Sequence, residues 1–485
     1  MFWTAASLAH LLAARWLTPA TDFPLTPGVC TDTRAIAPGK LFIALRGEKH
    51  DAHNFLAHAI TGGAPLLLID REEAFTRIHA DASLGRAHVL LVPDTAAALL
   101  TLAKAYRTYL GTLGATFIAV GGSNGKTSTV RMLHAALSQS LRGSSSQKSF
   151  NNAIGVPLTI LAAREDDQFV ICEVGTNAPG ELEPLSRVVQ PDIVVFTSLG
   201  REHLEGLGSL QGVADEEARL VTGIKPHGTI IAPRDGDASL LLASIRTTLA
   251  AEAKPATIIT FGTTPTADIA IASRTQTFDG LRCTLADGLT FSLPVLGLHN
   301  ATNAAATLAA TRTLRVPDFL ACQGLASVHP PAMRLERHTI PTAQGPIRVI
   351  NDAYNANPDS MLAAIATLRE IADQSAPTRL VFVLGDMLEL GAHAPASHNE
   401  VIAAALAAKP DALHLLGPLM TTAAQGLATT STTTTYPATT LEACEAIAAT
   451  LHAGDLVLLK GSRGTAVERV LKALQSRHAA QNSLT

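Results

Sequence analysis

A glycine-rich segment, AVGGSNGKTS, contains the residue types that bind the phosphates of a nucleotide. It follows an apolar run at 116–120 and precedes a segment of helical periodicity that begins near Lys126. Its glycines permit a tight turn whose N–H groups face phosphate oxygens, and a helix N-terminus adds positive partial charge. Lys126 can reach the terminal phosphates, and the Thr127 hydroxyl can ligate Mg²⁺. Strict Walker spacing would require glycine at Val120, so a plain strand-to-helix turn is the alternative interpretation.

The elements that must position this loop are those of an α/β protein. Continuous apolar, β-branched runs flanked by turn residues are typical of parallel strands covered on both faces. From the loop onward such runs lie at 168–174, 192–198, 229–233, 347–352, 379–386 and 455–461. Before the loop, short apolar runs alternate with Ala-rich helical stretches and predict a mixed α/β unit; they lie at 41–45, 65–69 and 88–92.

The length of 485 residues accommodates about three domains at roughly 150 residues each. The segment His329-Pro330-Pro331 is a credible linker between two of them. We therefore expect an α/β protein with a mixed domain at 1–112, a central parallel-sheet P-loop domain at 113–328 and a Rossmann-like domain at 329–485. The Thr-rich segment 429–435 is expected to be an exposed loop or sheet edge.

Composition excludes several classes of protein. Hydrophobic residues make up 47% of the chain and charged residues 16%, which excludes a disordered chain. A net charge of −4 gives no reason to expect nucleic-acid binding, and no apolar run is long enough to predict a membrane span. Five dispersed cysteines fit a reducing compartment, and the N-terminus lacks the basic segment of a signal peptide. The expectation is a cytoplasmic monomer.

Further segments, in chain order, resemble motifs of the Mur ligase family from about residue 30 to 470. Those of the catalytic core are FNNAIGVPLTIL (150–161), EVGTNAPGEL (173–182), TSLGREHLEGLGS (197–209), LGLHNATNAAAT (296–307) and KGSRGTAVE (460–468). Those that resemble the family member adding a dipeptide are CTDTRAIAPGKLFIALRGEKHDAHNF (30–55), VINDAYNANPDSM (349–361) and VLGDMLELG (383–391).

The resemblance implies an ATP-dependent, Mg²⁺-requiring amide ligase of cell-wall precursor synthesis. Its substrates would be UDP-MurNAc-tripeptide, bound by the N-terminal domain, and D-Ala-D-Ala. The ATP γ-phosphoryl would pass to the tripeptide carboxylate, and the dipeptide amine would attack the acyl phosphate. Two alternatives stay open: a related ligase with another substrate, such as a folyl-polyglutamate or cyanophycin-type ligase, and a non-catalytic nucleotide-binding homologue.

The resemblance also assigns roles to individual residues. Catalytic and metal-binding roles fall on Lys126, Thr127, Glu173 and His203. Nucleotide-binding roles fall on Gly122, Ser123, Asn124, Gly125, Lys126, Thr127, Ser128, Asn300, Asn303, Arg334 and Asp352. Substrate-binding roles fall on Thr31, Asp32, Thr33, Arg34, Gly47, Asp51, His53, Asn151, Asn152, Asn177, Tyr354, Asn355 and Asn357. For each alone, a turn, a helix cap or a solvated charge is the alternative.

Three positions depart from the family pattern. Met333 and Ala52 stand where glycine is usual. Most members also carry a lysine, carbamylated by CO₂ at the Mg²⁺ site, but residues 201–224 contain none. The register places Glu217 there, so we hypothesise that it supplies a permanent carboxylate as a metal ligand. A glutamate is shorter than a lysine carbamate, so Glu216 or a solvated acidic helix face remains the alternative.

Overall fold

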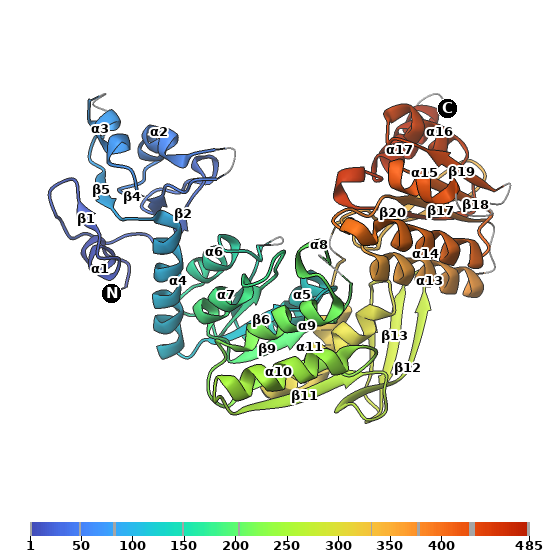
Figure 1. Cartoon of the computed structure of the whole chain (residues 1–485), viewed down its shortest axis with the longest axis horizontal. Helices are drawn as coiled ribbons and strands as arrows, with labels where there is room; N and C mark the ends of the chain where they lie inside the picture. Colours follow the sequence, from blue (N-terminus) through green and yellow to red (C-terminus); the bar gives the residue numbers. More distant parts are fainter. Residues whose placement is uncertain are drawn as a thin grey trace.

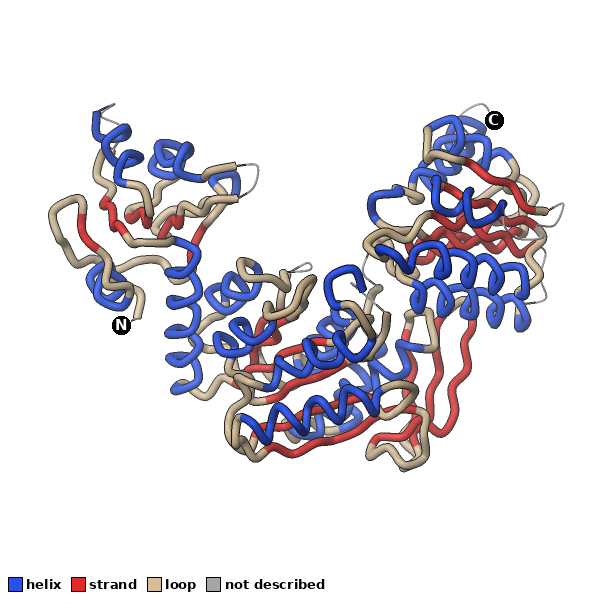
Figure 2. Tube along the Cα trace, viewed as in Figure 1, coloured by secondary structure: helices blue, strands red, loops and turns tan. Residues whose placement is uncertain are grey.

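The computed structural model describes residues 2–47, 50–80, 84–147, 150–201, 204–330, 332–375, 379–425 and 432–482. Three sheets with helices on their faces form three α/β units, which confirms the predicted fold class (Figure 1). The first and third units lie on opposite sides of the middle one. Figure 2 shows that each of the three units contains both helices and strands. No helix in the described ranges has the length and apolarity to cross a membrane.

The first unit is a small sheet with the strand order β1-β5-β4-β3-β2 among its described residues. Its strands are β1 (Arg15–Trp16), β2 (Val29–Cys30), β3 (Leu41–Ile43), β4 (Leu66–Ile69) and β5 (His88–Leu91). Its helices are α1 (Ala5–Leu11), α2 (Leu56–Thr61), α3 (Glu72–Ala80) and the short 3₁₀ turns η1 (Thr33–Ala35) and η2 (Ala52–Phe55). β2 to β5 are parallel and β1 is antiparallel, as expected for a mixed unit.

A long helix, α4 (Thr95–Thr112), joins the first unit to the middle one. Asp94 caps its N-terminus by accepting bonds from two backbone N–H groups. Tyr106 is buried in a core shared by both units, and Arg107 donates to Asp192 at 2.9 Å while being 1% exposed. A charged group buried to this extent needs such a partner. The first unit therefore packs against the middle one through a shared core and is not joined to it by a flexible linker alone.

The middle sheet has the strand order β14-β13-β12-β11-β10-β9-β6-β8-β7 among the described residues. Its strands are β6 (Thr116–Gly121), β7 (Gly143–Ser145), β8 (Phe169–Glu173), β9 (Ile193–Phe196), β10 (Gly228–Pro233), β11 (Ala256–Gly262), β12 (Ile269–Thr277), β13 (Gly280–Leu285) and β14 (Thr290–Leu293). Its helices are α5 (Lys126–Leu137), α6 (Gly155–Ala162), α7 (Leu182–Val189), α8 (Leu204–Leu207), α9 (Leu210–Ala218), η3 (Arg219–Val221), α10 (Ala238–Ala251), α11 (His299–Thr313) and α12 (Asp318–Ala326).

Both faces of this sheet are covered, as the continuous apolar runs predict. Along β6, Phe117 and Ala119 point into one core and Ile118 and Val120 into the other. This alternation follows from the two-residue period of a strand. The predicted strands at 168–174, 192–198 and 229–233 are present as β8, β9 and β10.

The third sheet has the strand order β15-β16-β20-β17-β18-β19 among the described residues. Its strands are β15 (Glu336–Ile340), β16 (Ile347–Asp352), β17 (Arg379–Gly385), β18 (Ala412–Leu416), β19 (Thr433–Tyr436) and β20 (Asp455–Lys460). Its helices are α13 (Pro358–Gln374), η4 (Gly391–His393), α14 (Ala394–Ala407), α15 (Pro418–Gln425), α16 (Leu441–Ala449), η5 (Arg463–Thr465) and α17 (Arg469–Asn482). The described part of the Thr-rich segment forms β19, which confirms the predicted sheet edge.

Candidate active site

The phosphate loop leaves β6 at Gly121 and enters α5 at Lys126. Gly122 has φ +107°, and a Cβ there would lie 2.6 Å from Thr197 Oγ1. Gly125 has φ +92°, and a Cβ there would lie 2.8 Å from Asn303 Nδ2. Both the left-handed backbone and the close neighbours require glycine at these two positions.

The loop that follows β9 holds the phosphate loop in shape. Ser123 N donates to Ser198 O at 2.9 Å, and Asn124 N donates to Ser198 Oγ at 3.0 Å. Ser123 Oγ donates to Gly200 O at 3.1 Å. The turn is thus fixed by hydrogen bonds before any ligand binds, which is the preorganisation that a phosphate cradle needs.

Four buried oxygens around the first turn of α5 have no partner at hydrogen-bond geometry among the described residues: Thr127 Oγ1, Thr129 Oγ1, Glu173 Oε2 and Glu217 Oε1. Thr127, Glu173 and Glu217 are the three of them that the sequence assigns to the metal. A buried polar atom without a partner is costly, and hydroxyl and carboxylate oxygens are the ligands that Mg²⁺ prefers. These residues therefore fit a divalent cation. His203 lies outside the described residues, within which no group of three or more His, Cys, Asp or Glu side chains is arranged so that it could hold a metal ion.

Lys126 supplies the positive charge at this place. Its Nζ donates to the backbone oxygens of Gly122 and Ser123. Burial raises the pKa of Glu173 and of Glu217, and the charge of Lys126 opposes that rise at both. The lysine therefore stabilises two buried carboxylates on either side of the phosphate loop.

The two neighbouring glutamates of α9 have different partners. Glu217 is completely buried, and its Oε2 accepts a bond from Gly122 N at 2.7 Å. Glu216 instead accepts bonds from Gly180 N and Leu182 N, both at 2.9 Å. Only Glu217 touches the phosphate loop, and because both side chains are buried they do not form a solvated acidic face.

The three asparagines assigned near the metal and substrate lie in different settings. Asn151 Nδ2 donates to Glu173 Oε1 at 3.3 Å. Asn152 Oδ1 accepts bonds from Ile154 N and Gly155 N and so caps the start of α6. Asn177 is exposed at the surface. Asn151 is thus the member of this group that contacts a candidate metal ligand.

A cavity beyond the phosphate loop lies between α5, the start of α11 and the linker. Its lining is Ser128, Arg131, Met132, Val295, Asn300, Val328, Pro330 and Arg334. The Arg334 guanidinium lies 4.3 Å from the Tyr354 ring centroid, a cation–π geometry. Asn300 Oδ1 accepts a bond from Asn303 Nδ2 at 3.1 Å. Arg131 was missed from the sequence, although its position three residues after Ser128 places both on one helix face.

The third unit approaches this region through the segment after β16. Asp352 Oδ2 accepts a bond from buried Lys460 at 2.6 Å. Asn355 is exposed, and its backbone oxygen accepts from the same lysine. Asn357 caps α13 and also donates from Nδ2 to Asn124 Oδ1 of the phosphate loop at 3.0 Å. Of these two asparagines assigned from the sequence, Asn357 has a side-chain hydrogen bond to the middle unit. For Asn355 the described contacts show only its backbone oxygen, which stays within the third unit.

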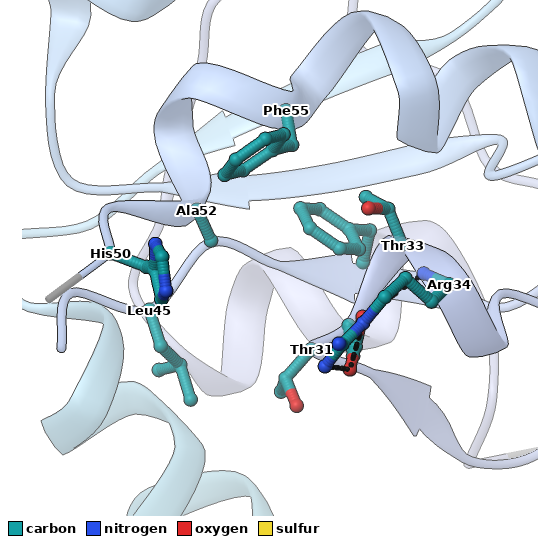
Figure 3. Close-up of a pocket in the computed structure, with 9 residues that line it drawn as sticks. Thr31, Thr33, Arg34, Leu45, His50, Ala52 and Phe55 are labelled. Atoms are coloured by element: carbon teal, nitrogen blue, oxygen red, sulfur yellow. Dashed lines mark hydrogen bonds and ion pairs between the residues drawn. The ribbon is translucent and has the colours of Figure 1, made fainter.

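A second, larger cavity of about 400 Å³ opens in the first unit (Figure 3). Its lining is Thr31, Asp32, Thr33, Arg34, Phe42, Leu45, His50, Ala52 and Phe55. Hydrogen bonds from Arg34 lower the Asp32 pKa to about 2. The cavity combines two aromatic rings with a guanidinium and hydroxyls, which suits a flat heterocycle joined to an anionic group.

Gly47, Asp51 and His53 do not line this cavity. Gly47 N donates to His50 O at 2.8 Å, which shapes the loop beside the cavity. The His53 side chain is buried, with Nδ1 2.6 Å from Asp51 and Nε2 accepting from Asp70 N at 3.2 Å. His53 therefore supports the cavity wall and does not face its interior.

Comparison with known proteins matches family models along most of the chain. The model for the Mur ligase family, catalytic domain, matches residues 27–107, that for the Mur ligase middle domain matches 120–311, and that for the Mur ligase, glutamate ligase domain, matches 333–463. The chain is 35% identical over 476 residues to the UDP-N-acetylmuramoyl-tripeptide--D-alanyl-D-alanine ligase of Bacillus subtilis (strain 168), covering 97% of this chain and 98% of that protein. The chain belongs to the Mur ligase family.

Solved structures of Mur ligases share the whole architecture. MurF from Acinetobacter baumannii superposes with a TM-score of 0.82 at 27% identity, covering 98% of this chain and 99% of that chain. MurF ligase from Thermotoga maritima, solved in complex with ADP, gives a TM-score of 0.77 at 22% identity, covering 94% and 99%. The family resemblance and the three-domain fold predicted from the sequence are both confirmed.

Proposed function

We propose that this Mur ligase joins D-Ala-D-Ala to UDP-MurNAc-tripeptide with ATP, giving UDP-MurNAc-pentapeptide, ADP and phosphate. The observation that carries the proposal is the end-to-end match to a ligase with this printed activity, together with the phosphate loop. The domains divide the work at 1–112, 113–328 and 329–485. Because ATP is supplied in the cytoplasm, we propose that the enzyme works there, and as a monomer.

The first domain binds the UDP-sugar substrate in its cavity. Phe55 is 40% exposed and presents its ring to the cavity (Figure 3), so it stacks on the uracil. Arg34 lies at the mouth, where its guanidinium pairs with a phosphate oxygen of the substrate. Thr31 and Thr33 donate to the remaining polar groups, and Asp51 and His53 hold the wall behind them.

The middle domain binds ATP, with the phosphates on the loop 122–128 and the nucleoside beside Asn300 and Arg334, where the structure has a small cavity of about 10 Å³. Lys126 compensates the phosphate charge, which favours transfer of the γ-phosphoryl to the tripeptide carboxylate. The carboxylate is a poor electrophile, whereas the acyl phosphate formed from it is a good one because phosphate is its leaving group. The dipeptide amine then attacks its carbonyl carbon and loses a proton as the C–N bond forms. The bond from that carbon to the bridging oxygen breaks, so phosphate leaves carrying the oxygen that came from the carboxylate.

Thr127, Glu173 and Glu217 hold Mg²⁺ together with His203. When bound, the ion would supply positive charge that offsets the negative charge of the phosphates. Glu217 accepts from Gly122 N through one oxygen and keeps the other free, so a permanent carboxylate is available without CO₂. Asn151 orients Glu173 through its 3.3 Å bond.

The third domain binds the incoming dipeptide beside the nucleotide. Tyr354 stacks under Arg334, and Asn357 contacts Asn124, so both residues lie where the third domain meets the phosphate loop. Asp352 faces the ribose hydroxyls, held in place by Lys460.

The test is phosphate release with ATP, Mg²⁺, UDP-MurNAc-tripeptide and D-Ala-D-Ala, omitting one component at a time. Release that requires all four supports the proposal. Release without the UDP substrate, or only with another amine acceptor, would favour a related ligase. ADP binding without any release would favour a non-catalytic homologue.

A further inference from the structure

The loop after β9 touches two domains at once. On one side its Thr197, Ser198 and Gly200 bond to the phosphate loop, including Gly200 N to Ser123 Oγ at 2.9 Å. On the other side lies Arg201, whose side chain contacts the third domain. A displacement of Arg201 would therefore also shift Gly200, which is hydrogen-bonded to Ser123 of the phosphate loop.

Arg201 binds two carboxylates of the third domain. Its Nε and Nη2 donate to Asp359 Oδ1 at 3.0 and 2.8 Å, and its backbone N donates to Asp359 Oδ2 at 2.7 Å. Its Nη1 donates to Glu400 Oε2 at 2.9 Å, and Nη2 to Glu400 Oε1 at 3.2 Å. Asp359 lies in the first turn of α13 and Glu400 on α14, so one guanidinium joins two helices of the other domain.

The surroundings of this contact are close-packed. A Cβ at Gly200 would lie 2.8 Å from Asp359 Oδ2 and 3.3 Å from Asn124 Nδ2. The Arg201 and Asp359 side chains are each 35% exposed, so the pair is partly shielded from solvent. A forked, multidentate pair of this kind holds orientation as well as distance, which a single exposed ion pair does not.

We propose that Arg201 is the positioning residue that sets the third domain against the phosphate loop, acting through Asp359 and Glu400. The role rests on the proposed function, because it serves to bring the dipeptide site and the phosphates into one geometry. Arg201 touches no reacting atom. It acts on turnover by fixing where α13 and α14 stand relative to Ser123 and Asn124.

The kinetic test is a mutant cycle read by phosphate release with all substrates. Arg201→Ala is expected to lower kcat about tenfold and to leave the KM for UDP-MurNAc-tripeptide unchanged, since that substrate binds the first domain. Arg201→Lys keeps the positive charge but cannot bond to both carboxylates with the forked geometry of a guanidinium. Its kcat is therefore expected to lie between those of Arg201→Ala and wild type. Glu400→Ala is expected to lower kcat in the wild-type background. In the Arg201→Ala background it should cause no further decrease, because the Arg201–Glu400 ion pair is already lost.

A matched control uses another arginine of the third domain. Arg369 pairs with Asp373 within α13 and is 32% exposed, close to the exposure of Arg201. Arg369→Ala removes an ion pair of similar exposure that joins nothing across the domains, so kcat is expected to stay within twofold. A kcat for Arg201→Ala within twofold of wild type, or additive effects of Arg201→Ala and Glu400→Ala, would overturn the proposal.

A second measurement separates this proposal from the ligase activity. Small-angle X-ray scattering of the unliganded protein reads the placement of the third domain without any turnover. Arg201→Ala is expected to increase the radius of gyration, and Arg369→Ala to leave it unchanged. If wild type shows no ligase activity but the scattering shift appears, the proposed function fails and the positioning role stands; an unchanged radius for Arg201→Ala contradicts the role itself.

Discussion

Replacing Glu217 by glutamine separates its charge from its hydrogen bond. The amide oxygen of Glu217→Gln still accepts from Gly122 N, so the turn keeps its anchor. What disappears is the negative charge facing Lys126 and the second carboxylate oxygen, which has no partner among the described residues. The variant therefore tests the carboxylate as a metal ligand and leaves the loop geometry in place.

The expected loss of activity is large and comes without loss of stability. Removing a residue that orients a metal ligand typically costs about 10–100-fold in metal affinity or activity, so we expect kcat/KM to fall by at least about tenfold. Burial raises the pKa of Glu217, so the folded state disfavours its ionised form. That penalty is absent at low pH and is fully present above the raised pKa. Glutamine removes it, so at neutral pH the Tm of the variant should equal or exceed that of wild type.

The assay is phosphate release as a function of Mg²⁺ concentration, with Tm measured on the same preparations. Asp215→Asn is the control, because Asp215 lies on the same helix, is exposed and bonds to Ser244 away from the phosphate loop. It should retain full activity. Wild-type activity should also be independent of added bicarbonate. An active Glu217→Gln, or strong bicarbonate dependence, would refute the reasoning; a Tm that falls with the activity would assign Glu217 to structure alone.

Three further changes test other parts of the account. Gly122→Ala places a Cβ 2.6 Å from Thr197 Oγ1 in a left-handed backbone, so it should lower the free energy of unfolding by about 1–3 kcal/mol and abolish ADP binding measured by calorimetry. Arg34→Ala should raise the KM for UDP-MurNAc-tripeptide about tenfold and leave the KM for ATP unchanged in steady-state assays; an equal rise in both would remove Arg34 from the UDP cavity. Burial lowers the pKa of His414 to about 4, so the unfolded state binds the extra proton between pH 6.5 and 4 and stability falls over that window, by up to about 3 kcal/mol. In urea titrations His414→Gln should flatten this part of the profile, and an unchanged slope would contradict the assignment.

The sequence predicts the parts of this protein that are local in the chain. The phosphate loop and α5 follow from the glycines and Lys126, and the buried strands follow from continuous apolar runs. The strands β12 to β14 were not predicted, because β13 and β14 are buried only on alternate residues and β12 carries the polar stretch Arg274 to Thr277. Their apolar residues pack with α11 and α12 in a core of the middle unit, and that packing joins residues that are distant in the chain.

Contacts between residues that are distant in the chain could not be predicted from the single sequence. The register identifies Glu217, but its bond to Gly122 joins residues 95 positions apart. Arg201 and Asp359 are 158 positions apart and belong to different domains. The resemblance places His53 with the substrate-binding residues, but no local pattern indicates that Asp70 accompanies it in the interior. Such partners are fixed by tertiary packing, which periodicity and motif spacing do not encode.

The most direct test of the central claim is the identity of the product. Purified protein is incubated with ATP, Mg²⁺, D-Ala-D-Ala and UDP-MurNAc-tripeptide that carries either diaminopimelate or lysine. The nucleotide products are then separated by chromatography and identified by mass spectrometry. The account predicts that UDP-MurNAc-pentapeptide forms with at least one of these substrates, in equal amount to ADP and only when ATP is present. ADP formed without a pentapeptide product, or a product extended by a single amino acid, would contradict it.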